Sequence, residues 1–397
     1  MEFIFSNRTA GVEPSAIREI FKSLTDPSII SFAGGNPNPL SFPAKELSEI
    51  AAELFTDPSC LQYGITEGYA PLIETVRKRC RDKFGIGGDG DAAMIVSGGQ
   101  QGIDLCARVL LNEGDTVLCE EPSFIGALNS FRSYGAKTVG IPMENDGIDI
   151  CAYEALLKNE KRVRLVYLIP TFQNPSGKTT SLEKRRAVVE LSEKYGVPVL
   201  EDNPYGELRF RGSDIPTMKS MDWSGNIIYC SSFSKLLSPG MRVGYVIGDK
   251  KLMAKMAVAK QSADVHTNLF FQMLCDRYIN GYDLDGHIRA ICDLYRGKCD
   301  LMLDSLDRYC GGKFEYTRPD GGIFIWCTLP DGLDGAEFTK IAVKNKVAVV
   351  PGQTFANDPK KQVCGFRLNY SMPSDEDIVK GIKILSDTFS EMKKTNH

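Results

Sequence analysis

A lysine set among hydroxyl and apolar residues is the most informative feature of the sequence. Residues 231–245 read S-S-F-S-K-L-L-S-P-G-M-R-V-G-Y, so Lys235 shares a short loop with Ser232, Ser234 and Arg242. A lysine in such surroundings loses its proton readily and can attack a carbonyl carbon. The serines and the arginine could supply hydrogen-bond donors to a phosphate. Taken alone, the stretch is explained equally well as a turn with an exposed lysine.

Three further stretches place polar groups where apolar runs end. The glycines of S-G-G-Q-Q-G at 97–102 would let the backbone approach an anion before an expected helix. P-T-F-Q-N-P-S-G at 170–177 and E-D-N-P-Y at 201–205 also follow apolar runs, and a buried Asp202 would need a positive partner. A structural turn is the simpler interpretation of each stretch alone. Together, however, they fall at the carboxyl ends of expected strands, where open α/β sheets bind ligands.

Strands and helices alternate along the part of the chain that must position these groups. Nearly continuous apolar runs predict strands at 94–97, 116–120, 137–141, 164–169, 198–202, 226–231 and 242–247. Helical patterns lie between them, for example at 102–111 and between an N-cap at Ser181 and a stop at Gly196. The prediction is an α/β fold with a mostly parallel central sheet and helices on both faces.

The two ends of the chain have a different pattern. After about residue 285 we expect a long helix, three strands and a closing helix, which indicates a smaller α+β unit. The first 43 residues follow no regular pattern and include the Gly/Pro-rich run F-A-G-G-N-P-N-P-L-S-F-P. We therefore predict an N-terminal arm at 1–43, a large domain at 44–284 and a small C-terminal domain at 285–397.

Composition argues against several classes of protein. With 47 lysines and arginines against 51 aspartates and glutamates, the net charge of −4 disfavours a nucleic-acid partner. The three histidines, His266, His287 and His397, are far apart, so we predict no metal site. The twelve cysteines form no C-x-x-C pair, which favours reduced thiols and a cytoplasmic location. No apolar run approaches the length of about 18 residues that a membrane span needs, so we expect no membrane partner.

In their order, these motifs resemble those of the pyridoxal-phosphate-dependent aminotransferases of class I/II, fold type I. The nearest branch contains the 2-aminoadipate/kynurenine and aromatic aminotransferases. The resemblance covers essentially the whole chain, from S-A-I-R-E-I near the N-terminus to G-F-R-L-N-Y near the C-terminus. It implies ping-pong transfer of an amino group from an amino acid to a 2-oxo acid such as 2-oxoglutarate, with pyridoxal 5′-phosphate as cofactor.

The resemblance also implies residue roles at the cofactor. Lys235 would form a Schiff base with the cofactor aldehyde and later move the proton, and Asp202 would pair with the ring nitrogen. Asn174 and Tyr205 would hydrogen-bond the phenolate oxygen, and Phe124 would stack on the ring. The phosphate contacts that it implies are the N–H groups of Gly99 and Gln100, the side chains of Ser232, Ser234 and Arg242, and Tyr63, which would reach the site of a neighbouring subunit. That last contact implies a homodimer with shared active sites.

On the substrate side, the resemblance implies that Arg367 clamps the α-carboxylate, with Asn174 and Gly35 nearby. Gly35 and Arg18 belong to the arm, which would contribute to the substrate site and the small domain, or serve as a plain dimer contact. Phe124 stands where relatives often carry tyrosine, and P-T-F-Q-N-P-S-G varies on a commoner P-T-G-Q-N-P-T-G.

Two other functions share these motifs. A β-lyase or decarboxylase on the same fold would keep the lysine, aspartate and phosphate motifs. A cofactor-binding regulatory module would carry a DNA-binding domain before the aminotransferase-like part, and we expect no room for one because the pattern begins almost at once.

Overall fold

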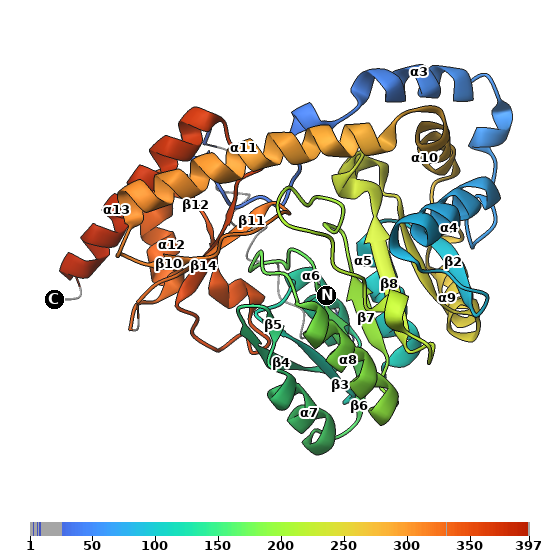
Figure 1. Ribbon diagram of the computed structural model, residues 1–397, viewed down its shortest axis with the longest axis horizontal. Helices are drawn as coiled ribbons and strands as arrows, with labels where there is room; N and C mark the ends of the chain where they lie inside the picture. Colours follow the sequence, from blue (N-terminus) through green and yellow to red (C-terminus); the bar gives the residue numbers. More distant parts are fainter. Residues whose placement is uncertain (1–2, 4–5, 7, 9–25, 331, 396–397) are drawn as a thin grey trace.

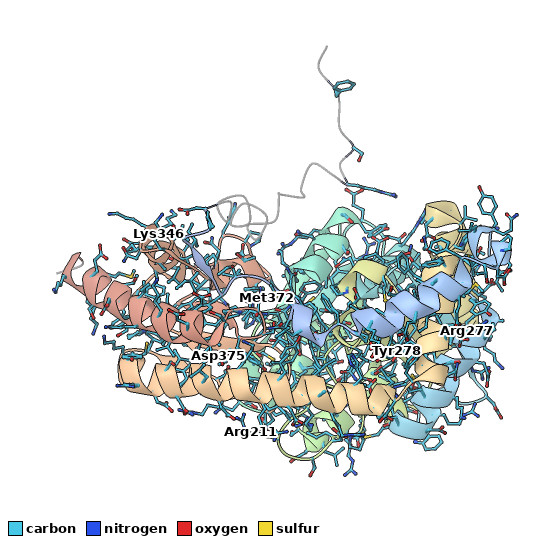
Figure 2. All side chains as sticks on the ribbon, turned by 90° about the horizontal axis from the view of Figure 1, so that it is seen from above. Arg211, Arg277, Tyr278, Lys346, Met372 and Asp375 are labelled. Carbon is cyan, nitrogen blue, oxygen red and sulfur yellow. The ribbon has the colours of Figure 1, made fainter. Side chains whose placement is uncertain are left out.

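The computed structural model describes residues 3, 6, 8, 26–330 and 332–395, and the structural statements below concern these residues. Figure 1 shows two lobes that are joined along one side by the long helix α11 (Leu284–Cys310). In Figure 2 this helix runs along most of the molecule, and Arg277 and Tyr278 lie toward one end while Asp375 and Lys346 lie toward the other. Arg18 and His397, which the sequence analysis singled out, lie outside the described residues.

A large mixed sheet forms the core of the first lobe. Its strands lie in the order β2 (Asp91–Val96), β9 (Gly244–Asp249), β8 (Ile227–Ser232), β7 (Val199–Asp202), β6 (Val163–Leu168), β3 (Thr116–Glu121), β4 (Lys137–Glu144) and β5 (Gly147–Ile148). The strands from β8 to β4 are parallel to one another, whereas β9 runs antiparallel to β2 and β8, and β5 runs antiparallel to β4. The predicted mostly parallel sheet is confirmed.

Two predicted boundaries near the candidate site are wrong. The strand predicted at 242–247 begins at Gly244, because Arg242 has a φ of 53° and lies in a turn. The helix predicted at 102–111 begins three residues earlier, at Gly99. Gly99 and Gln100 therefore belong to the first helical turn, where backbone N–H groups have no partner within the helix.

Helices cover both faces of the sheet. They are α5 (Gly99–Leu110), α6 (Ile125–Ser133), α7 (Ile150–Asn159), α8 (Leu182–Tyr195) and α9 (Lys250–Asp264). Val117 on β3 belongs to the hydrophobic cluster that contains residues of α5, α6 and α9, whereas the next residue, Leu118, belongs to the cluster of α7 and α8. Because successive strand residues point to opposite faces, a strand buried on both sides is apolar at most of its positions. This is the physical reason for the continuous apolar runs.

Caps bound α8 as the sequence predicts. The Ser181 side chain accepts a hydrogen bond from the Lys184 N–H at its start, and Gly196 ends it with a φ of 63°. The remaining helices of this lobe are α3 (Ala44–Leu54), α4 (Ala70–Phe84) and α10 (Leu269–Gly281).

The second lobe combines segments from both ends of the chain. Its antiparallel sheet has the order β10 (Glu315–Tyr316), β11 (Phe324–Thr328), β14 (Gly365–Asn369) and β13 (Val350–Pro351), with α12 (Gly335–Lys344) and α13 (Asp375–Thr395) beside it. A short strand from the predicted arm, β1 (Ile30–Ser31), pairs with β12 (Val347–Ala348). The predicted α+β character is present, while the division into arm, large domain and small domain remains a prediction.

Ten of the twelve cysteines are buried or nearly so, and none forms a disulfide; Cys151 is exposed and Cys364 is half-buried. Among the described residues, no helix has both the length and the apolar character needed to cross a membrane. The same residues contain no group of three or more His, Cys, Asp or Glu side chains placed to hold a metal ion.

Candidate active site

One cavity of about 260 Å³ collects every predicted site residue except Tyr63. It lies where the carboxyl ends of β7 and β8 meet the N-terminus of α5 and the small-lobe strands β11 and β14. Five further lining residues were not singled out as site residues from the sequence: Ile103, Ile169, Pro204, Pro239 and Phe324. Phe324 both belongs to the hydrophobic core and lines this cavity.

Lys235 ends a short 3-10 helix, Phe233–Lys235, that follows β8 directly. The turn is closed by the Ser232 hydroxyl, which accepts a hydrogen bond from the Ser234 N–H at 3.0 Å. The Lys235 Nζ donates to the Gly35 carbonyl at 2.5 Å, so residues two hundred positions apart meet here. Burial, together with the positive charges of Arg367 and Arg242, lowers the pKa of Lys235 to about 8. About a tenth of its amine is therefore neutral and nucleophilic at pH 7, far more than for a lysine with the ordinary pKa.

Asp202 is a buried carboxylate without a cationic partner among the described residues. It ends β7, is 4% exposed, and accepts a hydrogen bond from the Tyr167 hydroxyl on β6 at 2.7 Å. Burial raises its pKa to about 7, although the Tyr167 hydrogen bond opposes the rise. The site fits a ligand with a cationic N–H, such as a pyridinium ring, because that group would supply the missing positive charge.

Tyr167 is a site residue that sequence analysis missed. It is buried within the apolar run of β6, and a buried phenol normally needs a hydrogen-bond partner. A tyrosine hydroxyl within this apolar run was therefore the one sign in the sequence that Tyr167 has a polar partner. Which residue it would contact could not be read from the pattern, since Asp202 lies on the next strand of the sheet.

Arg367 lies in β14 and is 2% exposed. Its Nη1 donates to the Asn174 Oδ1 and its Nη2 to the Ala33 carbonyl, both at 2.8 Å, while its buried Nε has no partner. Its guanidinium lies 4.1 Å from the centre of the Phe324 ring. Burial lowers its pKa to about 10, which still leaves it cationic at neutral pH. A buried guanidinium with an unused N–H group fits a carboxylate ligand.

The N-terminus of α5 forms a cradle for an anion. Its N-cap, Gly98, has a φ of 81° and offers no side-chain cap, so the first N–H groups of the helix stay available. Arg242 lies against this turn and donates to the Ser97 carbonyl at 3.1 Å. A Cβ at Gly98 would lie 2.4 Å from the Arg242 Nη2 and would displace that guanidinium, and the positive φ also favours glycine. The hydroxyls of Ser232 and Ser234, 2.7 Å apart, line the same cavity.

The remaining predicted contacts are aromatic. Phe124 is the N-cap residue of α6 and lines the cavity. Tyr205 is 5% exposed and packs edge-on against Phe324, with ring centres 5.8 Å apart. Burial raises the pKa of the Tyr205 phenol, so this group is a hydrogen-bond donor at neutral pH.

Tyr63 lies outside the cavity and is 80% exposed. Its ring meets the His266 ring edge-on at 5.8 Å, and the Gly64 N–H donates to the His266 Nε2 at 3.2 Å. His266 therefore holds the segment that carries Tyr63, and it does not line the cavity.

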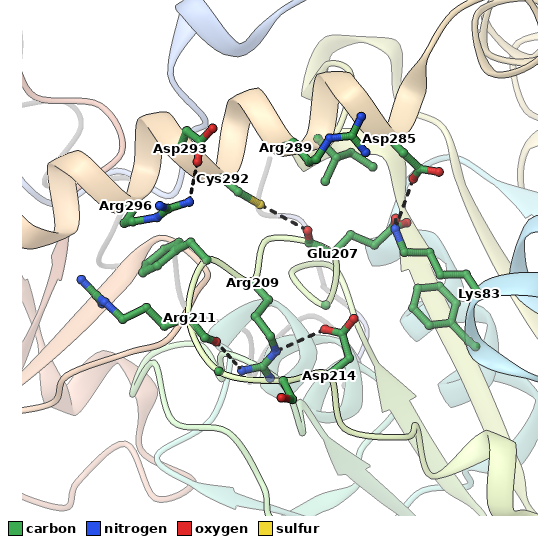
Figure 3. Close-up of a pocket in the computed structure, with 16 residues that line it drawn as sticks. Lys83, Glu207, Arg209, Arg211, Asp214, Asp285, Arg289, Cys292, Asp293 and Arg296 are labelled. Atoms are coloured by element: carbon green, nitrogen blue, oxygen red, sulfur yellow. Dashed lines mark hydrogen bonds and ion pairs between the residues drawn. The ribbon is translucent and has the colours of Figure 1, made fainter.

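A larger cavity of about 690 Å³ lies between α11 and the loop at 206–214, and it contains none of the predicted site residues. Figure 3 shows that its charged side chains face one another. Lys83 pairs with Glu207 at 2.6 Å, and Arg209 pairs with Asp214 at 3.3 Å. Because these charges are already matched, the smaller cavity is the better candidate for chemistry.

Known proteins resemble this chain over nearly its whole length. The profile of the family described as aminotransferase class I and II matches residues 28–385. The aromatic-amino-acid aminotransferase 1 of Thermococcus litoralis is 38% identical over 402 residues, covering 99% of this chain and 96% of the relative.

Solved structures agree with the sequence comparison. The kynurenine aminotransferase of Pyrococcus horikoshii in complex with PMP has a TM-score of 0.94 and 39% identity, covering 98% of this chain and 97% of that chain. The α-aminoadipate aminotransferase of Thermus thermophilus, complexed with N-(5'-phosphopyridoxyl)-L-leucine, has a TM-score of 0.90 and 35% identity, covering 98% of both chains. The expected fold type and the expected pyridoxal phosphate cofactor are confirmed. This chain belongs to the class I and II aminotransferases.

Proposed function

We propose that transamination by this enzyme takes place in the cavity around Lys235, with the residue roles stated above. The observation that carries the proposal is the joint placement of an amine with a lowered pKa, a carboxylate lacking a cation and an arginine with an unused N–H. When bound, pyridoxal phosphate supplies an aldehyde for the amino group and a ring that withdraws electrons from the substrate Cα.

Each side chain around that ring would have a separate role. The Lys235 Nζ would bind the aldehyde carbon, and after its release it would take the proton from the substrate Cα. The Asp202 carboxylate would hold the proton on the ring nitrogen. The absence of a cationic partner for this buried carboxylate among the described residues supports this role. Arg367 would clamp the substrate carboxylate with its free N–H groups, orienting the Cα–H bond. The Gly99 and Gln100 N–H groups and Arg242 would bind the phosphate.

For the substrate, we propose amino donors with aromatic or other uncharged side chains and a 2-oxo acid acceptor. The cationic side chains that line the cavity are Lys235, Arg242 and Arg367, and each already has a role. Among the described lining residues, none is left to bind a second carboxylate of the donor, whereas Phe124 and Phe324 offer apolar surface. The names of the Thermococcus and Pyrococcus relatives support aromatic and kynurenine-like donors.

We also propose a homodimer in which Tyr63 reaches the neighbouring site. Phe55, Leu61, Tyr63 and Ile65 are each at least 60% exposed although they lie close together in the chain. Large exposed apolar side chains in one segment are typical of an interface. A cytoplasmic location is proposed because none of the twelve cysteines forms a disulfide.

Single amino acids added to the purified holoenzyme test this function, because a donor changes the cofactor absorbance in a half-reaction without an acceptor. We expect phenylalanine and kynurenine to react faster than 2-aminoadipate, and Lys235→Ala to abolish turnover. Lys178→Ala is the matched control, since burial also lowers the pKa of Lys178 but this lysine does not line the cavity. Normal turnover in Lys235→Ala would refute the assignment. Release of pyruvate and ammonia from a cysteine conjugate without an acceptor would instead favour a lyase.

A further inference from the structure

An ion pair with a buried lysine lies at the end of α9, outside the active-site cavity. The Lys260 side chain is fully buried, whereas that of Asp264 is 27% exposed, and the Lys260 Nζ lies 2.7 and 2.8 Å from the two Asp264 carboxylate oxygens. Burying the lysine costs solvation that its attraction to a partly exposed carboxylate scarcely repays, and an acidic group at a helix C-terminus faces the negative end of the helix dipole. Stability alone therefore does not explain this pair.

The pair is connected to both ends of the turn that begins α5. Lys260 donates to the Gln101 Oε1 at 3.0 Å, and the Gln101 Nε2 donates to Asp264 at 2.6 Å. The same Gln101 Oε1 accepts the Ser97 N–H at 2.7 Å, and the Ser97 hydroxyl donates to Asp264 at 3.1 Å. Ser97 and Gln101 thus share the Lys260–Asp264 ion pair as their anchor.

Between these two anchored residues lie Gly98, Gly99 and Gln100, which carry the N–H groups assigned to the phosphate. The carbonyl of Ser97 also accepts the hydrogen bond from Arg242. A shift of Ser97 would therefore move the helix N-terminus and the arginine together. Since Gly98 provides no side-chain cap, the turn depends on these outside contacts for its position.

We propose that Lys260 and Asp264 are positioning residues that hold the segment 97–101 and Arg242 in the geometry that binds the cofactor phosphate. This inference rests on the proposed function of that segment. Neither residue lines the cavity, so their contribution acts through Ser97 and Gln101. The two residues would therefore affect the binding of the cofactor phosphate and not that of the cofactor ring.

The affinities of the full-length cofactor-free protein for pyridoxal phosphate and for pyridoxal test the proposal, because these probes differ only in the phosphate. We expect Lys260→Met and Asp264→Asn to raise the Kd for pyridoxal phosphate about tenfold or more, and to change the Kd for pyridoxal little. Lys158→Met is the matched control, since it breaks an exposed i,i+4 pair with Glu154 on α7. That variant should keep both Kd values.

Two outcomes would overturn the proposal. A loss of affinity for both probes would indicate general damage to the protein, and unchanged affinity for both would show that the ion pair does not affect the phosphate site. Should Lys260→Met fail to fold, Gln101→Met removes the three hydrogen bonds that run through Gln101 and leaves the ion pair and its bond to the Ser97 hydroxyl intact. An unchanged affinity ratio in that variant would also overturn the proposal. If the parent protein itself did not prefer pyridoxal phosphate to pyridoxal, the proposed phosphate site would be wrong, which is a distinguishable result.

Discussion

Replacement of Asp202 by asparagine should stabilise the cofactor-free protein at alkaline pH while removing a group that the function needs. The carboxylate is 4% exposed, and burial raises its pKa from an ordinary 3.8 to about 7. The interval between these two values corresponds to about 4 kcal/mol of folding free energy. This free energy is the expected cost of an ionised Asp202 when no cation lies beside it.

The sign follows from the raised pKa. The folded protein holds the proton more tightly than the unfolded chain, so the favourable contribution is complete below about pH 4. It is then lost as the pH rises toward about 7, where the folded carboxyl ionises. Asparagine stays neutral and can still accept the Tyr167 hydrogen bond. Asp202→Asn should therefore exceed the parent in stability by up to about 4 kcal/mol at pH 8 and match it near pH 4.

Urea unfolding of the cofactor-free parent and variant between pH 4 and pH 8 measures this difference. Asp115→Asn is the control of opposite sign: burial acts to raise the pKa of Asp115, but hydrogen bonds from Asn112 and Arg162 outweigh it and lower the pKa. That variant should lose stability at pH 8. Added pyridoxal phosphate should stabilise the parent more than Asp202→Asn. An Asp202→Asn protein less stable than the parent at pH 8 would refute the reasoning.

Two further predictions concern Lys235 and Gly98. With a pKa of about 8, Lys235 in the cofactor-free protein should react with pyridoxal phosphate at a rate that rises with pH and levels off above about pH 8. Stopped-flow absorbance measures this rate. A rate that keeps rising up to the ordinary lysine pKa of 10.5 would contradict the conclusion that burial lowers the pKa of Lys235. Gly98→Ala should cost about 1–3 kcal/mol in urea unfolding and also weaken binding of pyridoxal phosphate, because of its positive φ and its clash with Arg242. Gly196→Ala has a positive φ but nothing within 4 Å, so it should lose stability and keep the affinity.

Hydrophobic pattern and turn chemistry were local enough to predict much of the fold. The continuous apolar runs predict the parallel strands because a strand covered on both faces is apolar at most of its positions. Ser181 and Gly196 predict the ends of α8 because caps act within one helical turn. The order of the motifs also indicates the family, because it resembles that of the class I/II aminotransferases.

Contacts between distant segments could not be predicted in this way. Hydrogen bonds from Lys235 to the Gly35 carbonyl and from Tyr167 to Asp202 depend on which strands and loops become neighbours. The pKa of Lys235 and that of Asp202 likewise depend on burial, which is a property of the assembled core. By itself the sequence determined the elements, the motifs and the family of this protein, because these follow from local periodicity and residue type. Only the tertiary structure decided the depth of the site, its charges and the anchor of its phosphate turn, because these arise from residues that are 35 to 200 positions apart in the sequence.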